Sequence, residues 1–515
     1  MQYIEIGGSP WDLTRICKSW RHSAINTPRL WSQIHVALQP LRNRYPTPAV
    51  SRWSKNGEFC DTPERLERAL RRAGATPLDL VLEFRETENW LLPLRSIVGD
   101  ERQKTFEALL KLISGERMVH WKSVLLIASS TLPSGYLEGN LEKLESFEMD
   151  WRTGSSESHR RLLDSIDQTS INLRRLKFTG GLPTGSMERT WWSRLTELCL
   201  DSVSRQNLPC LLRQCVKLVK LTLGLAFSTE PATITEINVP TLRELVLSSC
   251  DMANLTSLLL PQLETLVLRH CADGPTGARL PAPAKLANLR KLTLDSTEIN
   301  ILGHIVVPKL EELEVRFTRV PYKKQVTAAF KAFNSQVTHR STLRVLKIVN
   351  ALVPEPGLKT MLEMSPNLTH LTLSCALSGR KVLDALATKK RKGWLCPALD
   401  TLEVDYTPST KKTKEAPLES LRPAVDAVIA ARMQEKPLGN VWYNGYGNLV
   451  EPDLAKRVDK RANKFAAPIP VPSLTMPTPP ILLPYWLPDA DYDYDSYADP
   501  LSDDEFDFMP WDYMF

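Results

Sequence analysis

The chain has 515 residues, of which 43% are hydrophobic, and a formal net charge of +6. This length allows several domains or one elongated array, and the apolar fraction is sufficient for an extensive core. The longest apolar runs, such as Leu258–Leu260, fall far short of the ~18 residues that a membrane-spanning helix needs, so we expect no membrane segment. A mild charge spread over so long a chain gives no indication of nucleic-acid binding.

The cysteines and the missing catalytic motifs exclude further classes of protein. Nine cysteines are scattered without disulfide or metal-ligand spacing. An odd count, with no paired framework and no secretory signal, predicts a reducing compartment, which is the cytoplasm, the nucleus or both. Phosphate-binding glycine loops, nucleophile motifs and zinc-binding histidine motifs do not occur, and the eight histidines are isolated. We therefore expect no enzyme, no catalytic residue, no metal and no cofactor.

Residues 1–40 are predicted to form a small helical unit rich in tryptophan. A helix that opens at Pro10 has apolar residues spaced at i, i+3, i+4 and i+7 on one face. These residues are Leu13, Ile16, Cys17 and Trp20. Thr27 then caps a second helix, because proline follows it at the first helical position. That helix would bring three apolar side chains inward, namely Leu30, Trp31 and Ile34.

Residues 41–120 are predicted to connect this unit to an array of repeats. A helix begins at Thr62 and ends at the C-cap Gly74. Its apolar side carries Leu66, Ala69, Leu70 and Ala73. Residues 78–82 alternate with period two, which indicates a strand, and a further helix spans 105–115. Segments 121–126 and 144–149 have the character of degenerate first repeats, as expected at the end of an array.

A ten-fold repeat dominates residues 121–405. Each copy has a Leu, two variable residues, a Leu or Val, one variable residue and another apolar residue, as in Leu289–Leu294. The first leucine of each copy is at position 173, 195, 218, 242, 263, 289, 310, 343, 368 and 399. The early steps of 21 to 26 residues are typical of leucine-rich repeats. We therefore predict an α/β leucine-rich-repeat solenoid, with parallel strands on its inner side and helical or irregular segments on its convex side.

Strand parity predicts which side chains line the inner, concave face of this solenoid. The second and last apolar positions of each copy point into the core, so the residues beside them point the other way. The principal candidates for substrate contact are Arg175, Lys177, Glu244, Arg269, Lys291, Glu312, Glu314, Arg316, Lys347 and His370. Glu197, Lys220, Thr222, Thr265, Asp295 and Glu403 belong to the same set. Curved repeat surfaces hold partners, so the chain is predicted to be a recognition protein.

The longer steps between copies leave room for convex helices at 325–337 and 381–392. Lys389–Lys392 is either a nuclear import signal or the basic end of the second of these helices. After Asp405 the repeat is predicted to end, and an amphipathic helix at 418–433 is expected to close the open edge of the sheet. Residues 406–465 form this cap and a basic segment. Residues 466–515 are rich first in proline and then in acidic and aromatic residues, which predicts disorder.

The N-terminal pattern resembles a known family. Ile16-Cys-Lys-Ser-Trp20, followed by Thr27-Pro-Arg-Leu-Trp31, resembles the second half of the F-box. Ala73–Leu82 is similar to the segment that follows the F-box in fungal F-box proteins with leucine-rich repeats. The resemblance spans most of residues 9–433. It implies that the F-box docks on the Skp-type adaptor of a cullin–RING ubiquitin ligase, while the repeats hold a protein substrate.

Carried over to this chain, the resemblance assigns adaptor binding to Leu13, Ile16, Cys17, Trp20, Leu30 and Trp31. The family's opening Leu-Pro-x-Glu-Ile/Leu helix is not matched by Met1–Gly8, so the F-box is incomplete. Either the start of the chain is truncated or adaptor binding is weakened. The alternative function is a protein-interaction scaffold outside any ligase, in the nucleus, that uses the solenoid and the acidic tail.

Overall fold

The structure is a computed structural model, and it describes part of the chain. The described residues are 14, 17–37, 58–60, 62–84, 104–128 except 106, 139–151, 157–181, 189–203, 207–225, 236–249, 255, 258–271, 284–317, 323–335, 342–349, 355–374, 379–389, 393–405 and 422–444 except 434. All of them belong to the unit Met1–Leu449. The predicted disorder of residues 466–515 lies outside the described residues.

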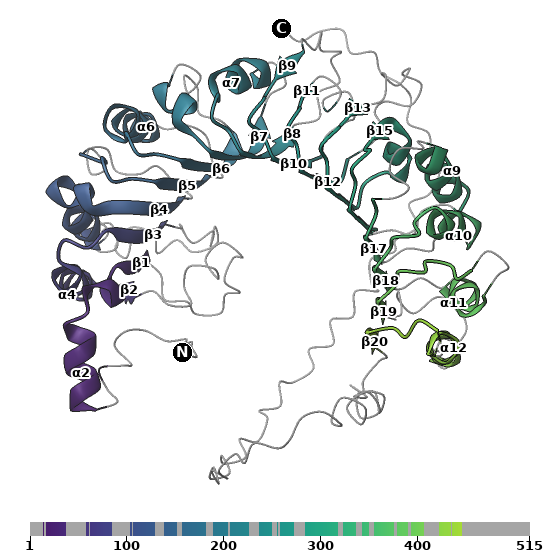
Figure 1. The fold of residues 1–515 in the computed structure, drawn as a ribbon. Coiled ribbons are helices and arrows are strands. Elements are labelled where there is room, and N and C mark those ends of the chain that lie inside the picture. Colours follow the sequence, from purple (N-terminus) through teal and green to yellow (C-terminus); the bar gives the residue numbers. More distant parts are fainter. Residues whose placement is uncertain are drawn as a thin grey trace, which may run out of the picture. The chain divides into compact units, whose positions relative to one another are not determined.

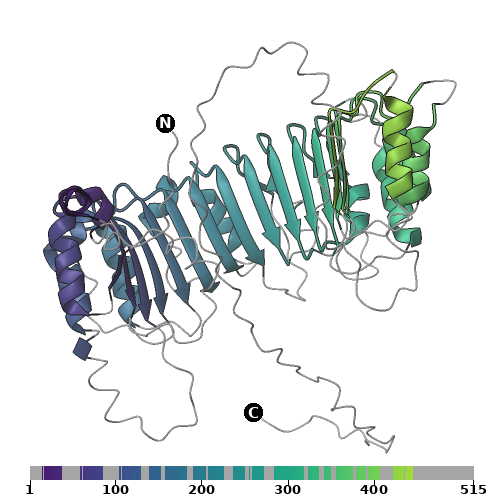
Figure 2. The ribbon, with the colours of Figure 1, turned by 90° about the horizontal axis from the view of Figure 1, so that it is seen from below.

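A single parallel sheet of 16 strands organises this unit (Figures 1 and 2). Its strand order is β2-β1-β3-β4-β5-β6-β7-β8-β10-β12-β14-β16-β17-β18-β19-β20, so nearly every strand pairs with the next main strand along the chain. The strands at its start are β1 Gln33–Ala37, β2 Glu58–Cys60, β3 Leu78–Phe84, β4 Trp121–Ala128, β5 Ser146–Trp151, β6 Arg175–Gly181 and β7 Glu197–Val203. They continue as β8 Lys220–Leu225, β10 Glu244–Ser248, β12 Thr265–Arg269, β14 Lys291–Asp295, β16 Glu312–Arg316, β17 Val345–Val349, β18 His370–Ser374, β19 Thr401–Asp405 and β20 Asn440–Asn444.

The described helices that connect the strands from β2 onward lie on the outer side of the curved sheet (Figure 1). The α-helices there are α4 Pro63–Ala73, α6 Glu157–Thr169, α7 Leu208–Gln214, α9 Lys323–Ser335, α10 Glu355–Glu363, α11 Gly379–Ala387 and α12 Arg422–Arg432. Single 3-10 turns are η2 Gly115–His120, η4 Thr190–Arg194 and η5 Ile299–His304. Two small sheets pair β9 Ile237–Asn238 with β11 Leu258–Leu259, and β13 Ala284–Lys285 with β15 Ile305–Val306. The α/β architecture with one large parallel sheet is compatible with the predicted solenoid.

The recurring leucines form the core between the sheet and its outer layer. The first leucine of each of the ten copies, from Leu173 to Leu399, is at most 3% exposed. The strands pair in register, so Leu245 lies beside Leu221 and Leu266, and equivalent apolar positions stack from strand to strand. Each fully buried leucine side chain stabilises the fold by about 1.5–3 kcal/mol. The predicted parity of the strands is confirmed by this burial.

The turns that leave β10, β12 and β14 repeat one geometry. Ser249, His270 and Ser296 have φ angles of 54°, 51° and 53°. Each of their backbone N–H groups donates to a carbonyl at the end of the next strand, at N···O distances of 2.8, 2.9 and 2.8 Å. Below this turn, the buried Cys271 Sγ donates to the Leu247 carbonyl at 3.6 Å, and in the next copy Thr297 Oγ1 donates to the Leu268 carbonyl at 2.9 Å. A small hydrogen-bonding side chain after the strand therefore satisfies a buried carbonyl in each of these two copies.

Several predicted helices are confirmed. The Thr62 hydroxyl accepts a hydrogen bond from the backbone N–H of Arg65, and Gly74 ends α4 with a φ of 59°. The four predicted inward residues of α4 are all buried. The helix predicted at 325–337 is α9, which begins and ends two residues earlier. The helix predicted at 381–392 is α11, but it ends at Ala387, because the Thr388 hydroxyl turns back to the Asp384 carbonyl and the helical hydrogen bonding stops there.

The N-terminal prediction is wrong in two respects. Cys17 has extended backbone angles and is the N-cap of α2 (Lys18–Ile25), so Cys17 and Trp20 do not lie on one continuous helix from Pro10. Leu13 and Ile16 lie outside the described residues. The second helix is only the 3-10 turn η1 (Pro28–Trp31), after which β1 joins the sheet. Ile34 and Val36 are two residues apart in β1 and are both buried. This spacing is that of a strand with one side facing the core, and it accounts for a strand at this place instead of a longer helix.

The C-terminal prediction is also corrected. The parallel sheet does not stop at Asp405, because β20 pairs in register with β19. The predicted edge cap is α12, and this helix packs beside α11 in the outer layer (Figure 1). Arg432, at the end of α12, is fully buried and donates to the backbone carbonyls of Leu386, Leu395 and Cys396. A buried arginine thus joins the last helix to the preceding coil.

Among the described residues, no helix is both long enough and apolar enough to cross a lipid bilayer.

Candidate binding surface

The inner face of the sheet carries three rows of side chains, one from every second strand position. The first row starts each strand and consists of Arg175, Glu197, Lys220, Glu244, Thr265, Lys291, Glu312, Val345, His370, Thr401 and Asn440. The middle row consists of Lys177, Cys199, Thr222, Val246, Val267, Thr293, Glu314, Lys347, Thr372, Glu403 and Trp442. The last row includes Ser248, Arg269, Asp295, Arg316, Val349 and Ser374.

All ten principal residues predicted from strand parity lie in these rows. The structure therefore brings them onto one continuous face, although substrate contact by them stays a prediction. They are not equally accessible: Arg175, Glu244, Arg269, Arg316 and His370 are exposed, whereas Glu314 is only 7% exposed. The row of any residue follows from strand parity alone, but this difference in exposure depends on its neighbours.

Oppositely charged side chains pair across neighbouring strands. Lys220 Nζ lies 3.0 Å from Glu244 Oε2, and Lys291 Nζ lies 3.1 Å from Glu312 Oε1. Lys347 reaches the same Glu312 oxygen at 3.4 Å. A further pair across strands joins Lys177 to Glu148, whereas Arg316 pairs with Glu314 within β16. Partly exposed pairs of this kind contribute at most about 1 kcal/mol each to the stability of the fold. Their main effect is to fix the positions of the charges on the inner face.

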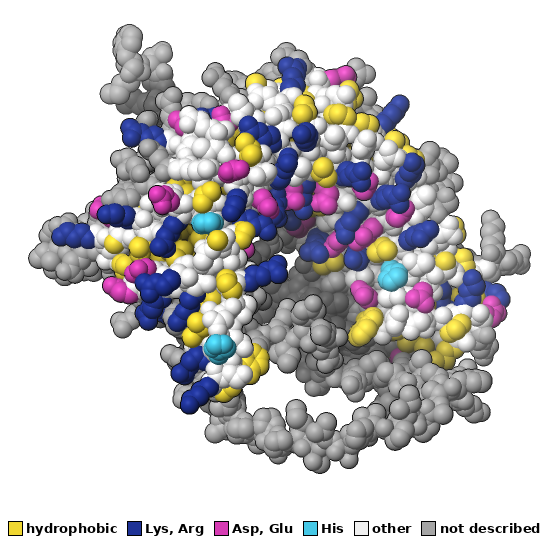
Figure 3. All heavy atoms as spheres, turned by 60° about the vertical axis from the view of Figure 1, so that its left-hand side comes forward, with side chains coloured by type: hydrophobic (Ala, Val, Ile, Leu, Met, Phe, Trp, Pro, Cys, Tyr) yellow, Lys and Arg dark blue, Asp and Glu magenta, His cyan; other side chains and the backbone are white. Residues whose placement is uncertain are grey.

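The pairing leaves the inner face nearly neutral. From β5 to β18, the basic residues on this face are Arg175, Lys177, Lys220, Arg269, Lys291, Arg316 and Lys347. The acidic residues are Glu148, Asp150, Glu197, Asp201, Glu244, Asp295, Glu312 and Glu314. Figure 3 shows the two signs interspersed over the hollowed side of the molecule. Among the described residues, the inner face therefore presents alternating charges of both signs to a partner.

Small uncharged side chains occupy the centre of the middle row. Cys199, Thr222, Val246, Val267 and Thr293 follow one another on β7, β8, β10, β12 and β14. The first four are half-buried and Thr293 is 9% exposed. We call these five residues the uncharged track. Charged residues of the first row border it, so the face offers an apolar strip with polar margins, which is the usual anatomy of a protein interface.

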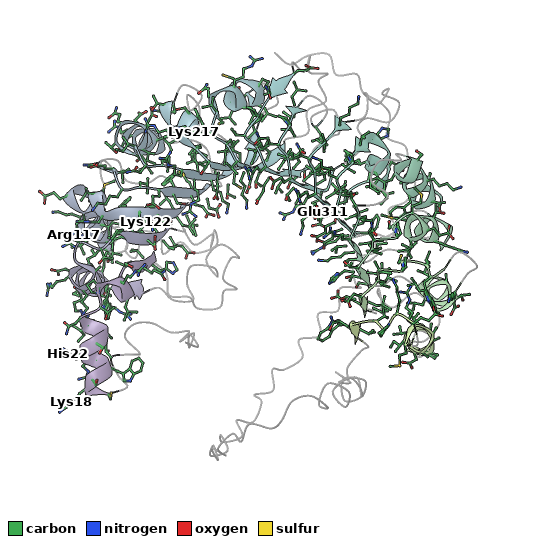
Figure 4. The ribbon with its side chains drawn as sticks, in the orientation of Figure 1. Lys18, His22, Arg117, Lys122, Lys217 and Glu311 are labelled. Carbon is green, nitrogen blue, oxygen red and sulfur yellow. The ribbon has the colours of Figure 1, made fainter. Side chains whose placement is uncertain are left out.

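A second line of ion pairs precedes the first row, where the chain enters the strands. Lys122 pairs with Glu145 at 3.9 Å, Arg243 with Glu264 at 3.6 Å, and Arg290 with Glu311 at 3.0 Å. Figure 4 shows Lys122 and Glu311 far apart along this edge of the arc. The alternation of sign therefore extends from the inner face to its rim.

The inner face is not open along its whole length. Val81, Leu125 and Ile127 lie on the inner face of β3 and β4, and they form a small buried cluster separate from the main core. His35 Nε2 lies 3.2 Å from Glu83 Oε2 on the same face. The sequence signal is the apolar character of both parities in these strands, which is typical of strands buried on two sides. The accessible inner face therefore begins at β5.

The Cys199 thiol, at the start of the uncharged track, and the amine of the neighbouring Lys177 are poor nucleophiles. Burial and the neighbouring Asp201 raise the pKa of the Cys199 thiol to about 11. Burial alone would lower the pKa of Lys177, but the hydrogen bond and charge of Glu148 outweigh it and raise that pKa above its usual value. Among the described residues, no group of three or more His, Cys, Asp or Glu side chains is arranged to hold a metal ion.

The residues assigned to adaptor binding separate into buried and exposed groups. Trp31 is fully buried: its indole N–H donates to the Ala24 carbonyl at 2.7 Å, and the Arg72 guanidinium lies 4.4 Å from its ring centre. Leu30 is half-buried against the core. Trp20 is 48% exposed on α2, and Cys17 is exposed at its N-cap. The sequence assignment therefore mixed core residues with surface residues.

Other exposed residues of α2 were missed. Ile25 is 36% exposed at the end of the helix. Lys18, Arg21 and His22 are exposed as well, and residues 17–37 contain no acidic side chain. Figure 4 shows Lys18 and His22 on α2, which projects from the end of the sheet. The absence of acids from this stretch was the available sequence signal.

No protein-family model and no curated protein matches this chain. The case for its function comes from its own surfaces.

Proposed function

We propose that the chain is the substrate-recognition subunit of a Skp–cullin–F-box type ubiquitin ligase. In this proposal the main sheet and its outer layer are leucine-rich-repeat coils of one solenoid. The period of 21 to 26 residues, the ten buried leucines and the in-register parallel strands support that assignment. The chain would supply proximity between a target and the ligase, and no chemistry of its own.

The exposure of α2 is the observation that carries the proposal. Seven of its eight residues are exposed, and Ala24 is the buried one. A short helix that is exposed to solvent on nearly all sides gains little stability from packing and has little stability of its own. Trp20 is a large aromatic residue in the middle of this helix, and aromatic residues of this size dominate interface energies. A partner that covers Trp20 and Ile25 would supply the missing apolar contact.

The buried half of the motif supports the same role in a different way. Trp31 fixes the end of α2 through the hydrogen bond to Ala24, and α4 holds Trp31 through Arg72. The motif's second tryptophan therefore positions the helix that carries the first. Trp31 is a positioning residue in this proposal, whereas Trp20 and Ile25 would contact the adaptor.

Substrate recognition is assigned to the accessible inner face from β5 onward. The uncharged track offers apolar contact, and the paired charges around it offer polar contacts of fixed sign and spacing. Neighbouring charges on this face already compensate each other. A partner that covers an ion pair loses the hydration energy of both charges, and it regains that energy only where its own polar groups bind each charge. This arrangement favours selectivity among protein partners over general attraction.

Co-expression with a Skp-type adaptor tests the ligase proposal. The full chain is expected to retain the adaptor through affinity purification, and W20K is expected to lose it. I171K is the matched control, because Ile171 is a 55% exposed apolar residue in the turn between α6 and β6, away from α2. A second chain, with an F-box opening helix added upstream of Met1, is tested in parallel. If neither chain retains the adaptor, or if W20K retains it fully, the ligase proposal fails.

A protein-interaction scaffold outside any ligase is the alternative, favoured by an inner face whose uncharged track and paired charges suit protein binding without an adaptor. Its nuclear form depends on Lys389–Lys392, of which the structure describes Lys389. Lys389 Nζ lies 2.7 Å from Glu435 Oε1, so this lysine is engaged within the fold. An import assay after neutralising residues 389–392 tests the nuclear form, and unchanged nuclear entry would contradict it.

A further inference from the structure

The last described strand of the sheet lacks the sequence features that usually protect an edge strand. β20 is the outermost strand, and its five residues Asn440-Val-Trp-Tyr-Asn444 carry no charge and no proline. Edge strands are normally protected by charges, proline, bulges or short length. The opposite edge of the sheet has such protection, because β2 is only three residues long. β20 instead pairs with β19 without any register shift.

An exposed tryptophan lies at the centre of this edge. Trp442 is the third of the five residues of β20 and belongs to the middle row, beside Glu403 of β19. It is 64% exposed, the largest value among the exposed apolar residues of the described part of the chain. An indole exposed to this extent on an unprotected edge costs solubility unless another surface covers it.

The helix of the same coil presents small side chains outward. α12 buries Ala424, Val425, Val428 and Arg432. Its other side exposes Pro423, Asp426, Ala427 and Ala430, and the exposed Met433 follows its last turn. Terminal coils of repeat proteins need a polar outer face. Here the exposed side of the helix contains one charged residue among the five.

We propose that the chain forms a twofold dimer through this C-terminal end, by antiparallel pairing of β20 with β20 of a second copy. Two identical parallel sheets that meet edge to edge about a twofold axis must pair antiparallel. Because Trp442 is the central residue, the axis places Trp442 opposite its own copy and Val441 opposite Tyr443 of that copy. A strand without charges meets itself with no like-charge repulsion, and opposed aromatic residues stabilise such a pair.

The helix face fits the same geometry. Strands pair about 4.8 Å apart, which brings the outer-layer helices of the two end coils close together. Small side chains at Ala427 and Ala430 permit that approach, whereas bulky or charged ones would hold the strands apart. A second copy is therefore a better occupant of this edge than an unrelated peptide, since both the strand and the helix are self-complementary.

Sedimentation velocity on the full chain tests the proposal. The wild type is expected to sediment as a dimer at micromolar concentrations. W442K and W442D are each expected to weaken dimerisation by roughly 30-fold or more, because each places two like charges on the axis and removes a central aromatic contact. An equal mixture of W442K and W442D is expected to restore the dimer, because opposite charges then meet.

One control variant and one further test variant separate loss of the dimer from loss of folding. L259K alters another half-exposed apolar residue, on β11, and is expected to leave the dimer intact. A430R changes the exposed side of α12 without touching the strand and is expected to weaken the dimer. A monomeric wild type at these concentrations would overturn the proposal. So would a mixture of the two Trp442 variants that stays monomeric, or an equal loss of dimer in L259K.

Discussion

Arg432 is predicted to be the residue on which the last coil depends most. Its guanidinium is fully buried and donates to three backbone carbonyls, those of Leu386, Leu395 and Cys396. The Leu386 carbonyl belongs to the final turn of α11, where helical carbonyls lack a partner within the helix. The Trp394 ring lies 5.4 Å from the guanidinium carbon. Burial lowers the pKa of Arg432, as expected for a desolvated cation.

The substitution R432M keeps the length of the side chain and removes every donor. The carbonyls stay buried without those donors, and each loss costs about 1–3 kcal/mol. Relief from burying a charge offsets part of this loss. We expect a net destabilisation of roughly 2–4 kcal/mol, which is in the range for breaking a buried polar network. A lysine retains the charge but has a point-like donor group, so R432K is expected to fall between wild type and R432M.

Hydrogen exchange read by mass spectrometry is the suitable assay, because coils of a repeat array contact mainly their neighbours. R432M is expected to lose protection in α11, α12 and β20, while β6 to β16 keep theirs. K436A is the matched control, since the exposed Lys436 follows α12 and its truncation should change protection little. Wild-type protection in R432M would refute the assigned role of the arginine. Loss of protection spread evenly over the whole sheet would refute the local character of the coil.

Three further outcomes are expected. W31A removes a fully buried indole, its hydrogen bond to Ala24 and its contact with Arg72, so thermal or urea unfolding of the N-terminal region should show a loss of about 3–5 kcal/mol. Burial, and to a lesser extent Glu145, raises the pKa of Asp79. Stability is therefore lost as pH rises from the ordinary aspartate pKa through the raised folded-state pKa, and D79N should unfold at higher urea concentration than wild type at pH 7 but not at pH 3. Alkylation of the Cys199 thiol by iodoacetamide should be slower at pH 8 than that of the exposed Cys17 thiol. Its rate should keep rising with pH until the pH reaches the Cys199 pKa of about 11.

Local patterns determined the repeating part of this protein. The spacing of Leu173 to Leu399 identified the core residues, because a side chain's parity in a strand follows from the backbone alone. Thr62, Pro63 and Gly74 determined both ends of α4, since capping depends on a few adjacent residues. The same parity placed Arg175, Glu244 and the other candidate residues on the inner face before any neighbour was known.

Tertiary structure decided the two ends of the sheet and the partners of its charges. Gln33–Ala37 and Asn440–Asn444 lack the leucine spacing, and they become strands because an adjacent strand offers them its free edge. Which lysine meets which glutamate depends on the register of strands more than 20 residues apart, as for Lys220 and Glu244. The burial of Arg432 follows from three carbonyls that only the folded coils bring together. The sequence determines which side of each segment is apolar, whereas long-range stacking determines what lies against it.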